Sequence, residues 1–188
     1  GVRYYTYITT MAYAMEAAKE NGLKMVVLDR PNPINGVTVD GPALDLALRS
    51  FAGYYPIPVR HGMTVGELAR FFNAEYKIGC DLEVVQVKNW NRALWFDQTG
   101  QPWVNPSPNI RNLNQASLYA AVGMLEASNV SVGRGTEQPF ELFGAPWIND
   151  VQLAEALNRL NLPGLSFTPI RFTPTSSLYR GQECGGVN

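Results

Sequence analysis

A short apolar run at residues 23–28 constrains the fold more than any other part of this sequence. Only Lys24 interrupts the run, which reads Leu-Lys-Met-Val-Val-Leu. Nearly continuous apolar runs of this length are typical of strands buried on both faces, as in parallel sheets. A helical pattern directly precedes it at residues 9–21, and Gly22 is a natural helix C-terminus. A helix followed at once by a buried strand indicates α/β layers.

Further periodic segments continue this alternation of helices and strands. Thr64 and Glu67 have the spacing of a capping box, which predicts a helix from there to about Tyr76 and makes Glu67 a helix cap rather than a catalyst. Asn149 and Gln152 predict the start of another helix, which reaches residue 160. The remaining predictions are a helix around residues 115–126 and strands at residues 82–87 and 165–172.

Composition and charge exclude several classes of protein. With 188 residues and 46% apolar residues, the chain can form a well-buried domain, or most of one domain and part of another. A net charge of −1 without a basic cluster argues against a nucleic-acid partner. No apolar run approaches the roughly 18 residues of a membrane span.

The same inspection gives no reason to expect a metal or a cofactor. Cys80 and Cys184 lie too far apart in the sequence for a metal-binding spacing. No Gly-x-Gly-x-x-Gly follows a predicted strand, which disfavours a nucleotide-binding domain. We therefore expect neither a metal site nor a bound cofactor.

A polar loop follows the first predicted strand. Ligands of open α/β sheets bind beyond the carboxyl ends of the strands, and residues 29–36 occupy that position with two prolines that stiffen the backbone. Asp29, Arg30, Asn32 and Asn35 offer a carboxylate, a guanidinium and two amides that can bind sugar hydroxyls or an acetamido group. The alternative is an Asp–Arg pair with Asx turns that only shape the loop.

A second polar stretch, residues 126–140, follows an apolar helical run. It contains Glu126, Asn129, Arg134 and Thr136, and glycines flank the arginine on both sides. Glycine permits a positive φ and the close approach of a ligand, while the planar guanidinium suits carboxylates and sugar oxygens. The alternative is a tight turn in which Arg134 holds loops together.

The only histidine and a group of aromatic residues are further candidates. His61 is suited to proton transfer near neutral pH, but a single histidine is also often a structural residue. Residues 89–113 lack regular periodicity and are too rich in aromatic residues for disorder. Trp90, Trp95 and Trp103 would either stack against sugar rings or form a packed cluster beneath a long loop.

Six spaced motifs occur in the same order as in a known family. They lie at residues 4–7 with 10–11, 29–33, 60–64 with 66–67, 106–109, 126–140 and 144–147. On these motifs the chain resembles, over essentially its whole length, the DUF1343 family, whose characterised members are exo-acting β-N-acetylmuramidases of the NamZ type.

The resemblance implies a Rossmann-like layered α/β domain joined to a second, smaller α/β domain, with a sugar cleft between them. Residues 1–110 would be the C-terminal part of the first domain and residues 111–188 the start of the second. It also implies a glycoside hydrolase that removes N-acetylmuramic acid from the non-reducing ends of peptidoglycan fragments. Family members usually act outside the cytoplasm, which predicts a periplasmic or secreted protein.

The resemblance also suggests roles for individual residues. Glycoside hydrolysis usually needs a carboxylic acid that protonates the leaving oxygen, and a second group that the N-acetyl substituent of the substrate can supply. Glu126 and Asp29 are the catalytic candidates. Arg30 and Arg134 are candidates for binding the lactyl carboxylate. The other candidate substrate-binding residues are Tyr7, Asn32, Asn35, His61, Asn129 and Thr136.

The sequence also departs from the family pattern. The family usually has Glu-Gly-Thr-Asn where residues 126–129 read Glu-Ala-Ser-Asn, and a glutamate where Val132 stands. The Glu-His-Gly segment of the family, a leading candidate for the catalytic acid, would lie upstream of Gly1. We therefore expect both ends to belong to a longer chain and residues 1–188 alone to be inactive. A non-catalytic module that binds cell-wall sugar is the alternative, because its polar loops and tryptophans would look the same.

Overall fold

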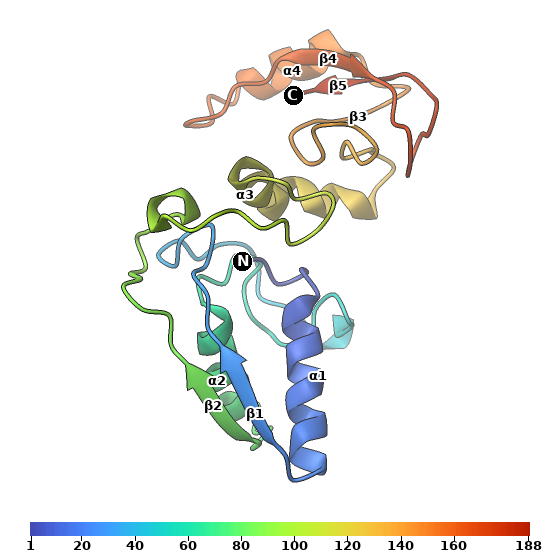
Figure 1. Cartoon of the computed structure of the whole chain (residues 1–188). Helices are drawn as coiled ribbons and strands as arrows, with labels where there is room; N and C mark the ends of the chain where they lie inside the picture. Colours follow the sequence, from blue (N-terminus) through green and yellow to red (C-terminus); the bar gives the residue numbers. More distant parts are fainter. The chain divides into compact units, whose positions relative to one another are not determined.

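The computed structural model describes residues 1–188, which fold into two compact units, Gly1–Pro102 and Trp103–Asn188. Both units combine helices with strands (Figure 1), so the predicted α/β class is confirmed. The predicted domain division at residue 110 stays a prediction. No helix has the length and apolar character that crossing a membrane would require.

The first unit is built around a pair of parallel strands. Its elements are α1 (Tyr7–Glu20), β1 (Lys24–Leu28), η1 (Leu46–Leu48), α2 (Val65–Glu75), β2 (Asp81–Val85) and η2 (Phe96–Thr99). Lys24 lies opposite Asp81, and Leu28 lies opposite Val85. Helices α1 and α2 both pack against the strands, as Figure 1 shows. The predicted capping box of α2 is confirmed. The Thr64 side chain accepts from the backbone N–H of Glu67, and the Glu67 side chain accepts from the backbone N–H of Thr64.

The core of the first unit lies between the two strands and the two helices. Met15 of α1, Val27 of β1 and Ala69 of α2 are buried together, and Leu82 and Val84 of β2 pack against them. A second cluster around Phe72 joins the helices to the aromatic segment near residue 55. These contacts hold the two helices and the two strands of the first unit together in one core.

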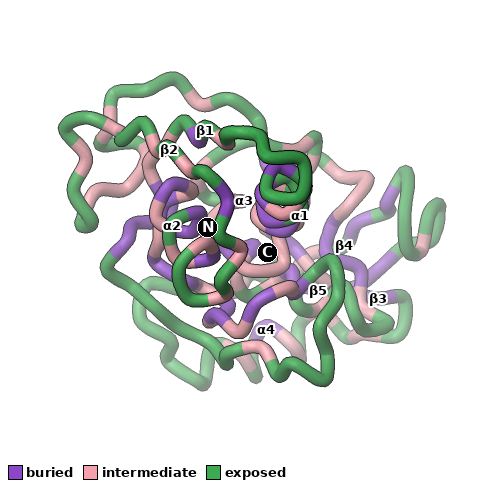
Figure 2. The backbone as a smooth tube through the Cα atoms, turned by 90° about the horizontal axis from the view of Figure 1, so that it is seen from below, coloured by how far each residue is buried: buried purple, intermediate pink, exposed green.

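The prediction that β1 is buried on both faces is wrong for the described residues. Burial alternates along both strands, and Figure 2 shows in purple the buried residues of the helices α1 and α2. Val26 is 48% exposed and Leu28 is 69% exposed, and Val85 of β2 is exposed beside them. The physical reason is that α1 and α2 cover only the face that carries Val27 and Val84.

The second unit packs a helix on a small antiparallel sheet. Its elements are α3 (Leu113–Val122), η3 (Gly123–Ala127), β3 (Phe143–Ala145), α4 (Asp150–Asn158), β4 (Pro169–Phe172) and β5 (Cys184–Val187). The strand order is β3-β5-β4, and α4 packs on β4 and β5 (Figure 1). Leu142, Phe172 and Cys184 form its core cluster. The predicted cap of α4 is confirmed, because the side chain of Asn149 accepts from the backbone N–H of Gln152.

Strand β5 was not predicted from the sequence, because Cys-Gly-Gly-Val lacks the alternation and the β-branched residues of a typical strand. The glycines are required by close backbone packing. A Cβ added to Gly144 would lie 2.3 Å from the carbonyl oxygen of Gly185, and one added to Gly186 would lie 2.1 Å from that of Phe143. These contacts let β3 and β5 approach without side chains between them.

Candidate functional site

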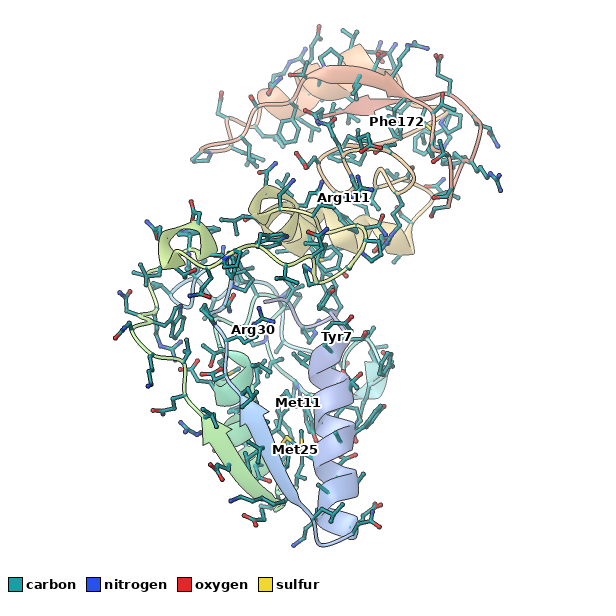
Figure 3. All side chains as sticks on the ribbon, in the orientation of Figure 1. Tyr7, Met11, Met25, Arg30, Arg111 and Phe172 are labelled. Carbon is teal, nitrogen blue, oxygen red and sulfur yellow. The ribbon has the colours of Figure 1, made fainter.

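The candidate loops of the first unit gather at the carboxyl ends of β1 and β2. Both strands are parallel, so their carboxyl ends lie at the same edge, and α1 begins there with Tyr7. Figure 3 shows Tyr7 and Arg30 at this end of the unit, whereas Met11 and Met25 lie between α1 and β1. Tyr7 is largely exposed and packs edge-on against Tyr5. This edge is where open α/β proteins bind their ligands.

Asp29 ties the end of β1 to the start of α2. Its Oδ1 accepts hydrogen bonds from the backbone N–H of Gly66 at 2.7 Å and of Arg30 at 2.9 Å, and its Oδ2 accepts from Thr64 Oγ1 at 3.0 Å. A Cβ at position 66 would lie 2.7 Å from Asp29 Cγ, so only glycine leaves room for the carboxylate. A carboxylate at a helix N-terminus also interacts favourably with the helix dipole. Asp29 stays a catalytic candidate, but its three hydrogen bonds also give it a structural role, which is to connect the end of β1 to the start of α2.

The two asparagines of this loop shape its backbone. Asn32 Nδ2 donates to the carbonyl oxygen of Met63 at 3.0 Å, and Asn32 Oδ1 accepts from the N–H of Ile34 at 3.2 Å. Asn35 has a φ of 58°, and its Oδ1 accepts from the N–H groups of residues 37 and 38. Both side chains are buried. For these two residues the geometry favours the Asx turns that the sequence left open as the alternative.

Arg30 presents the free guanidinium of this edge. The residue is exposed, and its only hydrogen bond is made by its backbone N–H to Asp29. Its side chain has no hydrogen bond and no ion pair, so a bound anion would meet no competing carboxylate. A free planar fork of donors on a proline-stiffened loop is suited to a carboxylate.

His61 is buried and neutral. It is 5% exposed, and its Nδ1 accepts from the backbone N–H of Met63 at 3.1 Å. The proton therefore lies on Nε2, which is buried without an acceptor. Burial is the main cause that lowers the pKa of His61 to about 3. The side chain can donate a hydrogen bond, but it does not supply a proton near neutral pH.

This pKa predicts an acid-sensitive fold. The unfolded chain binds a proton on His61 below its ordinary pKa of 6.5, whereas the folded chain does so only near pH 3. Stability should therefore fall as the pH falls through this window, by about 1.4 kcal/mol per pH unit from this residue. His61→Gln should lose about 2 kcal/mol less than the wild type between pH 7 and pH 5. Urea unfolding at both pH values measures the difference, and parallel losses in the two proteins would contradict the prediction.

In the second unit, the two strongest candidates of the polar stretch bind each other. Arg134 donates from Nε to Glu126 Oε1, and from Nη2 to Glu126 Oε2 at 3.1 Å. Both side chains are about one-third exposed, and the guanidinium lies 5.0 Å from the centroid of the Phe140 ring. The hydrogen bonds that Arg134 donates to the Glu126 carboxylate raise the pKa of Arg134. The sequence did not predict this pair, which engages both oxygens of the candidate acid.

The rest of this stretch is held by its own turns. Gly133 and Gly135 have positive φ values of 76° and 81°, as predicted, and a Cβ on Gly135 would lie 2.4 Å from the backbone N of Ser176. Thr136 Oγ1 donates to the carbonyl oxygen of Gly133 at 2.6 Å. Asn129 accepts from Tyr179 through its backbone carbonyl oxygen, at 2.8 Å, which leaves its amide exposed.

These contacts predict the behaviour of Arg134→Lys. Lysine keeps the charge but loses the two-pronged pairing with Glu126. We expect a loss of about 1 kcal/mol in stability, or a melting temperature lower by about 4–8 °C. Activity on substrates with and without a carboxylate should change alike. Thermal melting combined with assays on both substrates checks this. A selective loss on the carboxylate-bearing substrate, with unchanged melting, would show instead that Arg134 binds the substrate.

The tryptophans of the irregular segment lie close to arginines. The guanidinium carbon of Arg60 is 5.5 Å from the Trp95 ring centroid, and that of Arg92 is 5.9 Å from the Trp90 ring centroid. The two tryptophans are partly buried. Arg92 had no motif or periodicity to mark it in the sequence, yet it connects several candidate loops, as described below. No group of three or more histidine, cysteine, aspartate or glutamate side chains lies together in a way that could hold a metal ion.

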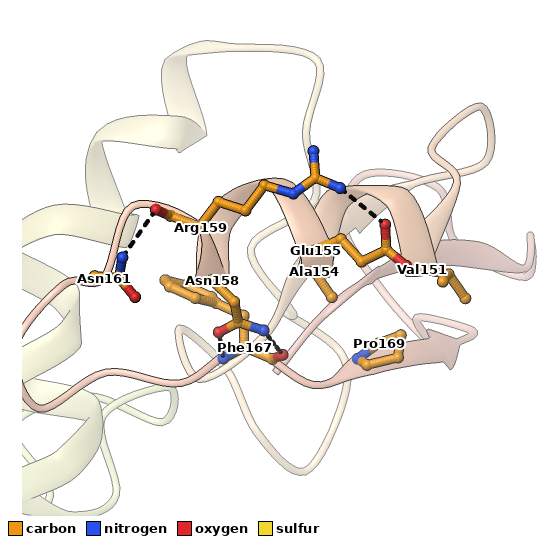
Figure 4. Close-up of a pocket in the computed structure, with 8 residues that line it drawn as sticks. All are labelled: Val151, Ala154, Glu155, Asn158, Arg159, Asn161, Phe167 and Pro169. Atoms are coloured by element: carbon orange, nitrogen blue, oxygen red, sulfur yellow. Dashed lines mark hydrogen bonds and ion pairs between the residues drawn. The ribbon is translucent and has the colours of Figure 1, made fainter.

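A groove of about 590 Å³ lies in the second unit, between α4 and the segment before β4 (Figure 4). Its polar residues are mostly engaged within the protein. Asn158 bonds to both the N–H and the carbonyl oxygen of Phe167, and Arg159 pairs with Glu155 at 3.3 Å. None of the predicted site residues lines this groove.

Comparison with known proteins assigns nearly the whole chain to one protein family. Residues 1–114 match the family described as exo-beta-N-acetylmuramidase NamZ, N-terminal, and residues 117–188 match its C-terminal counterpart. The chain is 54% identical over 187 residues to the peptidoglycan beta-N-acetylmuramidase NamZ of Bacillus subtilis (strain 168), covering 100% of this chain and 45% of that protein.

Solved structures agree with this placement. Two DUF1343 family proteins from Bacteroides fragilis NCTC 9343 match the whole chain, one with a TM-score of 0.95 at 40% identity and one with a TM-score of 0.81 at 36% identity. The chain covers 50% of each of those two chains. It therefore spans about half the length of the relatives that it matches.

Proposed function

Because the chain belongs to the NamZ family of exo-β-N-acetylmuramidases, we propose that this protein is a glycoside hydrolase that removes N-acetylmuramic acid from the non-reducing ends of peptidoglycan fragments. The observation that carries the proposal is the identity of 54%, over the whole chain, to a peptidoglycan β-N-acetylmuramidase. A non-catalytic sugar-binding module is not favoured, since both halves match a family of muramidases. A location outside the cytoplasm is part of the proposal, because the substrate belongs to the cell wall.

Each unit offers one candidate group for this reaction, and each is proposed from the contacts within its own unit. Arg30, the free guanidinium at the carboxyl end of β1, would bind the lactyl carboxylate that distinguishes N-acetylmuramic acid from N-acetylglucosamine. Glu126 stays the carboxylate of this chain with the better claim to act as acid, because Asp29 is occupied by three hydrogen bonds at the start of α2. To protonate a leaving oxygen, Glu126 would have to release Arg134.

The test uses the natural chain that contains residues 1–188. It should release N-acetylmuramic acid from an aryl N-acetyl-β-muramide and from the non-reducing end of a wall disaccharide. Products are identified by mass, and the enzyme is assayed from pH 5 to pH 9. A folded protein that binds N-acetylmuramic acid but never cleaves either substrate would favour the binding module and overturn the proposal.

A further inference from the structure

Arg92 joins three separate segments of the first unit. Its Nη1 donates to the carbonyl oxygen of Gly62 at 2.9 Å and to that of Gly36 at 3.3 Å. Its Nη2 forms an ion pair with Glu67 Oε1, and its own carbonyl oxygen accepts from the N–H of Gly36 at 2.7 Å. One side chain therefore contacts the loop after β1, the loop before α2 and the first turn of α2.

Two glycines make this contact possible. A Cβ on Gly36 would lie 2.9 Å from the carbonyl oxygen of Gly62 and 3.2 Å from Arg92 Nη1. Gly62 has a φ of +67°, and its Cβ would lie 3.0 Å from the carbonyl oxygen of Gly36. The two loops thus approach backbone to backbone, and their carbonyl oxygens converge on one nitrogen of the guanidinium. A side chain at either position would force the loops apart.

The contact continues to the end of β1. Glu67 Oε2 accepts from the N–H of Thr64 at 2.9 Å, and the N–H of Glu67 donates to Thr64 Oγ1 at 3.2 Å. Thr64 Oγ1 donates in turn to Asp29 Oδ2. An unbroken series of hydrogen bonds therefore runs from Arg92 through Glu67 and Thr64 to Asp29, the residue before Arg30.

We propose that Arg92 is a positioning residue of the candidate site: it fixes the loop at residues 31–36 relative to the loop at residues 60–64, and so sets where Arg30 holds the sugar. The inference rests on the proposed function. Arginine is required because its rigid fork reaches a carboxylate with one nitrogen and two carbonyl oxygens with the other. Lysine offers a single flexible ammonium and cannot hold all three acceptors in the same arrangement.

The experiment compares Arg92→Lys with Arg159→Lys in the natural chain, below the melting temperature of both. Arg159 is a matched control, because it is an exposed arginine paired with Glu155 in the second unit and contacts none of these loops. Arg92→Lys should lower kcat on an aryl N-acetyl-β-muramide by about 10- to 100-fold, since small misplacements of a bound substrate cost this much. KM should change much less, because the guanidinium of Arg92 is bound within the protein by Gly36, Gly62 and Glu67. Arg159→Lys should stay within about twofold of the wild type.

A second readout does not depend on catalysis. Hydrogen exchange of peptides that cover residues 31–39 and 60–64 should accelerate in Arg92→Lys and not in Arg159→Lys, because the loops lose their common anchor. If Arg92→Lys does not fold, Glu67→Gln replaces it. Glutamine can preserve the capping box but offers Arg92 no carboxylate, so kcat should fall in the same direction and the fold should persist.

The outcomes separate the two proposals. If the wild type cleaves the muramide, and Arg92→Lys or its replacement keeps a kcat within twofold of the wild type, the positioning role is overturned. If the wild type binds the sugar and never cleaves it, the proposed function fails. In that case, unchanged exchange in the two loops of Arg92→Lys would also overturn the positioning role, and faster exchange would support it.

Discussion

Arg30→Lys should lower kcat/KM on an N-acetylmuramic acid glycoside by about ten- to a hundredfold, which corresponds to one charge-assisted hydrogen-bonding pair. The N-acetylglucosamine analogue should be nearly unaffected, because it has no lactyl carboxylate. Arg30 is exposed, and its guanidinium has no partner in the protein. The substitution keeps the charge but removes the planar fork, and stability should change little because no internal contact is lost.

Two comparisons make this result specific. Competition by free N-acetylmuramic acid and by free N-acetylglucosamine gives inhibition constants for the two sugars without any cleavage of the competitor. Arg134→Lys is the matched variant, since its guanidinium is already bound to Glu126. Equal losses on both sugars in Arg30→Lys would contradict the proposal that Arg30 binds the lactyl carboxylate. A loss that is selective for N-acetylmuramic acid only in Arg134→Lys would contradict it as well.

Asp29→Ala should destabilise the first unit by about 3 kcal/mol, because it removes an ionised acceptor from three donors and leaves partly buried N–H and O–H groups without a partner. A loss of this size lowers the melting temperature by more than about 10 °C. Residual activity measured well below the new melting temperature should stay within about tenfold of the wild type. Circular dichroism melts and single-temperature kinetics provide both values.

The opposite pattern would give Asp29 a different role. If Asp29→Ala melts like the wild type and loses activity by several orders of magnitude, the carboxylate takes part in the reaction. Asp29→Asn is the companion variant, since an amide oxygen in the place of Oδ1 can still accept from the N–H groups of Gly66 and Arg30 while the NH₂ group faces Thr64 Oγ1. It should melt between the wild type and Asp29→Ala.

The sequence predicted those parts of the fold that depend on local patterns. The capping box at Thr64 and the cap at Asn149 are determined by residues three apart, and both form as expected. Strand β5 could not be predicted, because its glycines are required by the close approach of the β3 backbone, which the sequence does not show. The exposed face of β1 was also not predicted. An apolar run predicts a strand, but it does not show whether helices cover one face of that strand or both.

The candidate site shows the same division. The sequence correctly predicted that residues 29–36 follow the end of a strand and that Gly133 and Gly135 have positive φ values. It could not predict that Glu126 and Arg134 bind each other, because their pairing depends on the turns between them. Arg92 lay outside any motif, and its importance comes from the carbonyl groups of Gly62 and Gly36, which are 30 and 56 positions away in the sequence.

The uncovered face of β1 and β2 has a consequence for handling this chain. Val26 and Leu28 of β1 and Val85 of β2 are exposed apolar residues next to the Lys24–Glu83 ion pair, and the outer edges of both strands are unpaired within the described residues. Open edges next to apolar surface are templates for the addition of further strands from neighbouring molecules. The 188-residue chain should therefore be sensitive to its own concentration, with self-association rather than unfolding as the process that limits how concentrated a solution of it can be.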